Sequence, residues 1–125
     1  MNIAVVGASN NSEKYGFRIL RHLSEEKHTV FPVNTHEATI QGLPVYKTVA
    51  DIEQSIDIID FVVPPAATLA VLQQVAKKGK YNVWIQPGAE SPEVIAFLEK
   101  HKDDFNMVVY NDCIMTSLTR YFPNA

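Results

Sequence analysis

The residues of this 125-residue chain that could hold or transform a ligand lie in five short segments, each directly after an apolar run rich in valine and isoleucine. The segments are Gly7-Ala8-Ser9-Asn10, Val33-Asn34-Thr35, Val63-Pro64-Pro65, Gln86-Pro87-Gly88-Ala89 and Asn111-Asp112-Cys113. In an open α/β sheet, ligands bind beyond the carboxyl ends of the strands, where the strand order reverses. If the apolar runs are parallel strands, all five segments meet at that edge of the sheet.

The first segment carries chemistry suited to a phosphate. Gly7 follows the first apolar run and lets backbone amides approach an anion closely. The motif is not GxGxxG, because Ser9 stands in place of the second glycine and Gly16 lies far beyond the spacing of the third. A nucleophile elbow is excluded too, since Asn11 replaces its second glycine and no acid–base partner is spaced to activate Ser9. Taken alone, this loop is equally compatible with a phosphate site and with a tight turn that binds nothing.

The second segment discriminates between nucleotides. Proteins that bind NAD usually end the second strand with Asp or Glu, which holds the adenosine ribose, whereas this strand ends in Val33-Asn34-Thr35. An uncharged Asn34 tolerates an adenosine whose ribose carries an extra phosphate, as in coenzyme A and NADP. Lys14 and Arg18 share one face of the helix after the first loop, where each either reaches a phosphate or stays solvated. The residues therefore disfavour NAD and favour a nucleotide with a phosphorylated ribose.

The remaining reactive side chains form no catalytic or metal-binding constellation. The four histidines lack metal-ligand spacing, and His36, in the loop after the second strand, either lines a site or stays solvated. Cys113, the single cysteine, either meets a ligand or fills the core. We expect Asp60 to accept hydrogen bonds from backbone amides or a neighbouring loop, and Trp84 to lie in the core. No catalytic residue and no metal ligand is predicted.

Buried strands and amphipathic helices alternate along the chain and position these segments. Unbroken apolar runs predict strands over 2–6, 29–33, 56–63, 82–85 and 107–110, with a short extended piece around 45–46. Periodicity and capping residues predict helices from Ser12 to about Lys27, from Ala66 to Lys78, and from Ser91-Pro92 to about Lys102. Residues 34–43 are expected to form a loop. The pattern predicts an α/β, Rossmann-like fold, with a doubly wound, mainly parallel sheet of five to six strands and helices on both faces.

Composition limits the partners of the chain. Its length and 46% hydrophobic residues predict a single domain over residues 1–125, and 11 basic against 14 acidic side chains give a net charge of −3. Without a concentrated basic surface, neither nucleic acid nor an anionic membrane is an expected partner. The apolar runs are far shorter than the ~20 residues that cross a bilayer, and no signal segment opens the chain. Because a single cysteine forms no internal disulfide, we expect a cytoplasmic location.

Five stretches together resemble a known family: GASNNSEKYG, FPVNTHEATIQGLPVY, DIIDFVVPP, VWIQPGAES and VVYNDCIM. In this order they are similar to the small single-domain CoA-binding proteins of bacteria, which resemble the CoA-binding domain of the succinyl-CoA synthetase α subunit. The resemblance implies a CoA diphosphate near Gly7-Ala8-Ser9 and an adenosine near Val33-Asn34-Thr35. It also implies that Val63-Pro64-Pro65 lines the crevice and that Gln86-Pro87-Gly88 lies near the pantetheine arm.

The chain departs from the family pattern at two places. The family usually has proline and a basic residue after the first loop, where Ser12 and Lys14 stand here, and Asn-Pro in place of Asn34-Thr35. Loss of these prolines loosens the loops. The phosphohistidine of the synthetase resides in a second domain, so ligase activity is not implied for a chain of this length.

The leading hypothesis is a non-catalytic module that binds coenzyme A or an acyl-CoA in the crevice at the carboxyl ends of the strands. One alternative is a small NADP-type oxidoreductase or enzyme subunit that uses the same crevice, with Cys113 or His36 near the reactive end. Another is a regulatory interaction module whose crevice is vestigial. The segment 113–125 could pack on the domain or on a second subunit, so a homodimer or a protein partner is also considered.

Overall fold

The central sheet is built from five apolar runs of the chain. In the computed structural model, which describes residues 1–125, the strands are β1 (Asn2–Val6), β2 (Thr29–Val33), β5 (Ile58–Phe61), β6 (Asn82–Ile85) and β7 (Met107–Tyr110). They pair in parallel in the order β2-β1-β5-β6-β7. Counted among themselves, the order is 2-1-3-4-5, so the winding reverses between β1 and β5. The topological switch point therefore lies at the carboxyl ends of these two strands.

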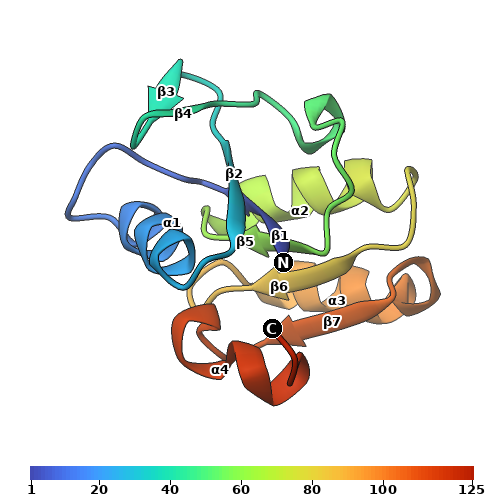
Figure 1. The fold of residues 1–125 in the computed structure, drawn as a ribbon. Helices are drawn as coiled ribbons and strands as arrows, with labels where there is room; N and C mark the ends of the chain where they lie inside the picture. Colours follow the sequence, from blue (N-terminus) through green and yellow to red (C-terminus); the bar gives the residue numbers. More distant parts are fainter.

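Helices cover both faces of the sheet (Figure 1). They are α1 (Tyr15–Glu25), α2 (Pro65–Val75), α3 (Pro92–Lys100) and α4 (Ile114–Tyr121). On one face, Leu72 of α2 and Val94 of α3 belong to a core cluster with Phe61. On the other, Leu20 of α1 belongs to a second cluster with Trp84, which is fully buried as predicted. The prediction of an α/β, Rossmann-like fold with a mainly parallel sheet is confirmed, with five strands in the main sheet.

The residues predicted as a loop after β2 contain a small hairpin. β3 (Thr39–Ile40) and β4 (Leu43–Pro44) pair antiparallel as a separate two-stranded sheet. Ile40 is fully buried in the cluster on the α1 side, which anchors the hairpin beside the loop that follows β1. The extended piece predicted around 45–46 contains a bridge from Tyr46 to Val33, and short 3-10 turns lie at Val49–Asp51 and Lys102–Asp104.

The helix after β1 begins later than predicted. Ser12 is exposed and caps nothing, while Lys14 occupies the N-cap position without a side-chain hydrogen bond. The reason is a turn at Asn11, whose side-chain oxygen accepts the Glu13 N–H at 3.0 Å and whose carbonyl accepts the Lys14 N–H at 3.0 Å. Ser91 does cap α3 as predicted and accepts the Val94 N–H at 3.2 Å. None of the helices combines the length and apolarity needed to cross a membrane.

Asp60 contradicts the expectation that it meets backbone amides or a loop. It is fully buried in β5, in register with Val5 and Trp84 of the neighbouring strands, and neither carboxylate oxygen has a hydrogen-bond partner. Burial raises the pKa of this carboxyl well above its usual range, because a charge is poorly solvated in the core. Asp60 is therefore a polar defect in the apolar layer directly below the crevice residue Val62.

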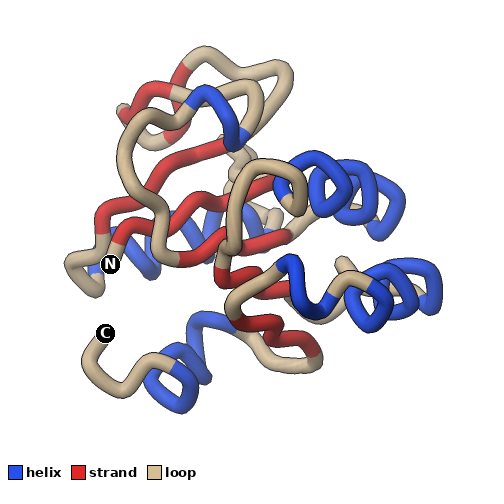
Figure 2. The backbone as a smooth tube through the Cα atoms, turned by 90° about the vertical axis from the view of Figure 1, so that its right-hand side faces the viewer, coloured by secondary structure: helices blue, strands red, loops and turns tan.

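Both chain termini lie away from the carboxyl edge of the sheet. In Figures 1 and 2 the two ends lie near each other. The Met1 amino group is 3.1 Å from Nδ1 of His28, which precedes β2, and Ala125 lines a small pocket that also includes His28. The termini therefore leave the opposite edge, with its strand-end loops, free.

Candidate functional site

Three adjoining cavities follow the carboxyl edge of the sheet. The central cavity, of about 660 Å³, lies over the switch point between β1 and β5. A second cavity of about 320 Å³ lies on the β2 side and shares Gly7, Asn34 and Val63 with the first. A third, of about 150 Å³, lies on the β6 and β7 side and shares Tyr15 and Val62. We call them the central, β2-side and terminal cavities; together they form one crevice.

The central cavity has unused backbone donors on its β1 side. The N–H groups of Ser9, Tyr15 and Gly16 donate to no protein acceptor, whereas those of Phe17 and Arg18 bond to the Lys14 carbonyl. Tyr15 and Gly16 form the first turn of α1, which contains no acidic residue. A helix N-terminus with free N–H groups carries a partial positive charge. This side of the cavity is therefore built to receive an anion.

We call the unused N–H groups of Ser9, Tyr15 and Gly16 the cradle. Two glycines let the segments that carry it approach each other closely. Gly7 has φ +101, and a Cβ at this position would lie 2.5 Å from the Val62 carbonyl oxygen. A Cβ on Gly16 would lie 2.0 Å from the Gly7 carbonyl oxygen, so only glycine lets α1 approach the loop after β1. Gly16 thus allows the close helix packing that the third glycine provides in GxGxxG proteins, across a longer loop. Sequence reasoning set Gly16 aside on spacing alone.

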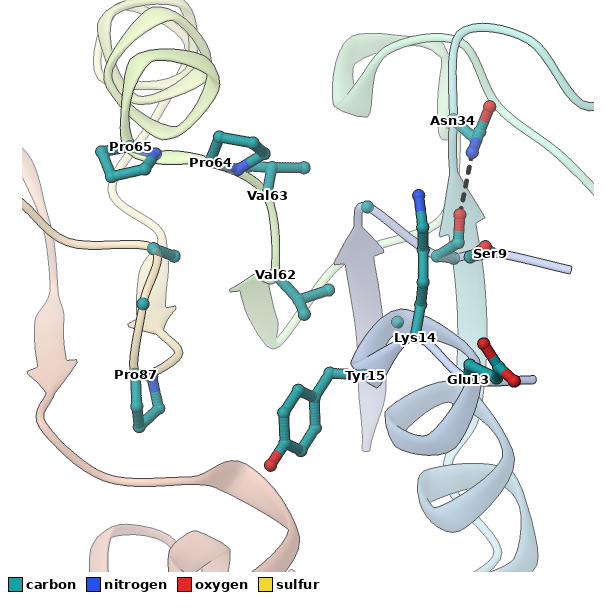
Figure 3. Close-up of a pocket in the computed structure, with 15 residues that line it drawn as sticks. Ser9, Glu13, Lys14, Tyr15, Asn34, Val62, Val63, Pro64, Pro65 and Pro87 are labelled. Carbon is teal, nitrogen blue, oxygen red and sulfur yellow. Dashed lines mark hydrogen bonds between the residues drawn. The ribbon is translucent and has the colours of Figure 1, made fainter. Parts of the chain in front are cut away.

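Charged side chains of both signs line the central cavity. Lys14 is the one cation among the lining residues, and Figure 3 shows its side chain extending between the Ser9 loop and Asn34. Glu13, which sequence reasoning did not select, lines the same cavity and is exposed. An anionic ligand would therefore be attracted by Lys14 and repelled by Glu13.

Asn34 fastens two loops of the crevice together. Its side-chain nitrogen donates to the Ala8 carbonyl at 2.9 Å, drawn as the dashed line in Figure 3. Its side-chain oxygen accepts the N–H groups of His36 at 2.7 Å and Glu37 at 3.1 Å. Asn10 makes a similar tie, donating to Glu37 at 3.0 Å and to the Thr39 carbonyl at 2.9 Å. These amides hold the walls of the crevice in place.

The β2-side cavity combines an apolar wall with a few polar groups. Val33, Val49 and Val71 contribute aliphatic surface, as an adenine ring requires. His36 and Lys47 also line it, and both residues are exposed. Lys47 directly follows the extended piece predicted around 45–46, whose end was not among the five selected segments, so the search of strand ends missed it.

The far wall of the central cavity is largely apolar. Val62 and Val63 follow β5, and their position is fixed by a hydrogen bond from the Val62 N–H to the Val6 carbonyl at 2.9 Å. Pro64 and Pro65 begin α2 and, having no N–H, add only ring surface. Figure 3 places this wall opposite Lys14 and Tyr15.

The terminal cavity has a mostly apolar wall and two polar residues, Gln86 and Cys113, that are hydrogen-bonded to each other. Gln86 is buried; its oxygen accepts the Ile114 N–H at 2.9 Å and its nitrogen lies 3.2 Å from the Cys113 sulfur. Nearby, Asp112 accepts hydrogen bonds from the hydroxyls of Tyr121 at 2.7 Å and Ser117 at 3.1 Å. The bond from Tyr121 is the main reason that the pKa of Asp112 is lowered. These bonds fasten α4 to the ends of β6 and β7.

Most residues predicted for the site line one of the three cavities, and two do not. Those in the central cavity are Gly7, Ala8, Ser9, Lys14, Asn34, Val63, Pro64, Pro65, Pro87 and Gly88; Val33 and Thr35 line the β2-side cavity and Gln86 the terminal one. Asn10 and Arg18 line none of the three: Asn10 ties the loops, and the Arg18 guanidinium lies 5.8 Å from the centre of the Tyr15 ring. Lining residues outside the predicted segments include Glu13, Tyr15, Gly16, Lys47 and Val62.

Sequence comparison places the same residues in a family. Residues 1–119 match the family described as "CoA binding domain". The chain is 35% identical over 78 residues to an ADP-forming acetate-CoA ligase of Methanocaldococcus jannaschii, and 37% identical over 84 residues to the α subunit of ADP-forming acetate-CoA ligase II of Pyrococcus furiosus. The matches cover 62% and 66% of this chain but 11% and 18% of those relatives. The chain thus corresponds to a small part of each.

Solved structures show the same relationship. A conserved hypothetical protein from Pyrococcus furiosus has a TM-score of 0.86 at 40% identity, covering 93% of this chain and 97% of its own. A dinucleotide-forming acetyl-coenzyme A synthetase from Ca. Korarchaeum cryptofilum has a TM-score of 0.69 at 29% identity, covering 86% of this chain and 25% of its own. The fold therefore occurs both by itself and within a much larger chain.

Proposed function

The chain belongs to the CoA-binding domain family, and we propose that it binds coenzyme A or an acyl-CoA along the three cavities. The observation that carries the proposal is the cradle of free N–H groups at Ser9, Tyr15 and Gly16, which suits a diphosphate. The cradle lies at the topological switch point, where open α/β sheets bind nucleotides. The adenosine then occupies the β2-side cavity, and the pantetheine arm runs past Pro87 towards the terminal cavity.

The role proposed for the crevice is to hold the thioester without transforming it. Its lining supplies backbone donors, apolar surface and the two lysines Lys14 and Lys47, which are means of binding and orientation. In the ligase relatives the matched segment is a small part of a larger chain or subunit. We propose by analogy that a partner protein or a second copy of this chain meets the bound thioester, and size-exclusion chromatography with and without CoA tests this.

Thermal unfolding with candidate ligands tests the proposed ligand. A ligand present at 100 times its Kd adds about 2.7 kcal/mol to the stability of the folded state. For a domain of this size this raises Tm by roughly 10 °C. We expect this shift with CoA and none with NAD. A shift with NADP but not with CoA would replace the proposal with the oxidoreductase alternative, and no shift with any nucleotide would favour the vestigial crevice.

Substitutions at two lysines test where the diphosphate and the ribose phosphate of CoA bind. Lys14→Gln should weaken CoA by about tenfold, the value of one charge-assisted hydrogen bond, and Lys100→Gln on α3, which lines none of the three cavities, is the matched control. Lys47→Gln should weaken CoA but not 3′-dephospho-CoA, because Lys47 would face the ribose phosphate. Equal binding of these two nucleotides by the unchanged protein would overturn the placement of the adenosine.

A further inference from the structure

The terminal cavity continues the crevice beyond the point where the thiol of a bound CoA would arrive. It is lined by Tyr15, Val62, Gln86, Pro87 and Cys113, of which Tyr15, Val62 and Pro87 also line the central cavity. The cavity lies over the carboxyl ends of β5 and β6, on the opposite side of the diphosphate cradle from the β2-side cavity. A ligand that occupies the β2-side and central cavities can therefore reach it only with its far end.

The chemistry of the walls selects a neutral group. None of the five lining residues carries a formal charge at neutral pH, and Val62, Pro87 and the Tyr15 ring present mostly apolar surface. The polar atoms of Gln86 and Cys113 are bonded to each other and to the Ile114 N–H, which leaves one amide N–H of Gln86 without a protein acceptor. None of the lining residues offers a cation to a carboxylate; Arg18, whose guanidinium lies 5.8 Å from the centre of the Tyr15 ring, does not line the cavity. A thioester carbonyl has two unpaired donors among the lining residues, the free amide N–H of Gln86 and the Tyr15 hydroxyl.

The size of the cavity selects a short group. Its volume is about 150 Å³, and an apolar cavity of about this volume holds a molecule the size of benzene. Tyr15 stands at the boundary with the central cavity, and Figure 3 shows its ring directed from the start of α1 towards the side of Pro87. It is the one large hydrophobic side chain that is exposed, at 61%. A ligand lying between Tyr15 and Pro87 would cover this ring.

We infer that the terminal cavity, with Tyr15 as its outer wall, is an acyl subsite that accepts short uncharged acyl groups, of about two to four carbons, and excludes longer or carboxylated ones. The inference rests on the proposed binding of CoA and adds the class of acyl group to it. Tyr15 is then a specificity-determining residue through its side chain, while its backbone N–H serves the diphosphate.

Calorimetric titration with a series of thioesters tests the subsite. The ligands are CoA, acetyl-, butyryl-, succinyl- and octanoyl-CoA, and the quantity compared is the affinity of each thioester relative to free CoA in the same variant. We expect acetyl-CoA and butyryl-CoA to gain about fourfold per buried carbon, and succinyl-CoA and octanoyl-CoA to gain nothing. Tyr15→Ala should remove the discrimination against octanoyl-CoA, because the outer wall is lost.

Two substitutions at Cys113 test whether the space of the terminal cavity is needed: a larger side chain fills it and a smaller one leaves it open. Cys113→Leu should abolish the gain of butyryl-CoA over CoA by occupying the space, whereas Cys113→Ser should retain it, and thermal melts establish that both variants fold. If CoA itself does not bind to the unchanged protein, the proposed function fails. If CoA binds but all thioesters bind alike, or octanoyl-CoA binds best, the proposed function stands and the acyl subsite is wrong.

Discussion

On the β1 side of the crevice, the backbone N–H groups of Ser9, Tyr15 and Gly16 have no protein acceptor, whereas on the β6 and β7 side the polar groups of Gln86 and Asp112 are hydrogen-bonded within the protein. The first side thus has three backbone donors without protein acceptors, whereas most polar groups named on the second side are hydrogen-bonded within the protein. Unpaired donors on a loop and at a helix end can bind an anion without first breaking a hydrogen bond within the protein. Polar groups that are already hydrogen-bonded within the protein instead fix the shape of the cavity wall. If the proposed function is correct, charge is recognised on one side of the crevice and size on the other.

The largest loss of stability and of CoA affinity is expected from a substitution at Gly16, where α1 packs against the loop after β1. In Gly16→Ala the added Cβ would lie 2.0 Å from the Gly7 carbonyl oxygen, which forces α1 away from the loop. We expect stability to fall by about 3 kcal/mol and CoA affinity to fall at least about 100-fold as two donors are lost. Urea unfolding and calorimetry measure the two. Gly79→Ala, whose Cβ would meet nothing closer than 3.8 Å, is the control. A folded Gly16→Ala protein with full affinity would show that the anion is not bound on the β1 side.

Asp60 offers a second test of the comparison. Its carboxylate has no hydrogen-bond partner, like the cradle N–H groups, but it is fully buried and therefore out of reach of a ligand. Its pKa is raised in the folded state, so the folded protein holds the proton more tightly than the unfolded chain, and stability declines as pH rises above the ordinary value of about 4. We expect Asp60→Val to be more stable than the unchanged protein at pH 8 by about 1 to 3 kcal/mol. The difference should shrink towards pH 4, as followed by urea unfolding. A destabilised Asp60→Val at pH 8 would mean that the carboxyl has a partner in solution.

A substitution at Asp112 tests the hydrogen bonds on the β6 and β7 side of the crevice. The pKa of Asp112 is lowered in the folded state, mainly by the hydroxyl of Tyr121, so its contribution to stability is present above pH 4 and is lost as pH falls through the lowered pKa. Asp112→Asn should therefore destabilise the protein at pH 7 and matter much less at pH 3. Tyr121→Phe should reproduce part of the loss. Thermal melts at pH 7 and pH 3 measure the decrease in Tm caused by the substitution. An equal decrease at both pH values would contradict the prediction.

Glu13 should give the smallest effect. Its exposed carboxylate lines the central cavity together with Lys14 and opposes a bound diphosphate. Glu13→Gln should strengthen CoA binding about two- to threefold at low salt, and the gain should vanish near 1 M salt, where charges are screened within about 3 Å. Glu99→Gln on α3, which lines none of the three cavities, is the control. Weaker binding in Glu13→Gln would assign the carboxylate a role in holding the ligand.

The sequence predicted the strand ends well because buried parallel strands are continuous apolar runs. Four of the five strands have the predicted bounds: Asn2–Val6, Thr29–Val33, Asn82–Ile85 and Met107–Tyr110. The fifth, predicted over 56–63, is shorter and covers Ile58–Phe61. Once these are correct, the topology brings Gly7, Asn34 and Val63 to one edge without further information. Local chemistry, rather than long-range packing, decides these elements.

What the sequence could not predict depends on distances between segments. The role of Gly16 follows from its approach to Gly7, which no spacing rule expresses when the loop is longer. Asp60 has no partner because of what surrounds it in three dimensions. Lys47 follows the bridged residue Tyr46 and Tyr15 begins α1, so both reach the crevice from outside the five selected segments. Arg18 was placed beside Lys14 on a helix face, but Lys14 precedes the helix and Arg18 instead lies over the Tyr15 ring.

The position of the two termini makes this fold easy to join to other polypeptides. Met1 and Ala125 both lie beside His28, at the edge of the sheet opposite the crevice. A fusion partner or a biosensor surface attached at either end would meet the back of the molecule and leave the ligand-binding loops facing solution. The same position of the termini suits a fold that occurs both by itself and as about a quarter of a much larger chain.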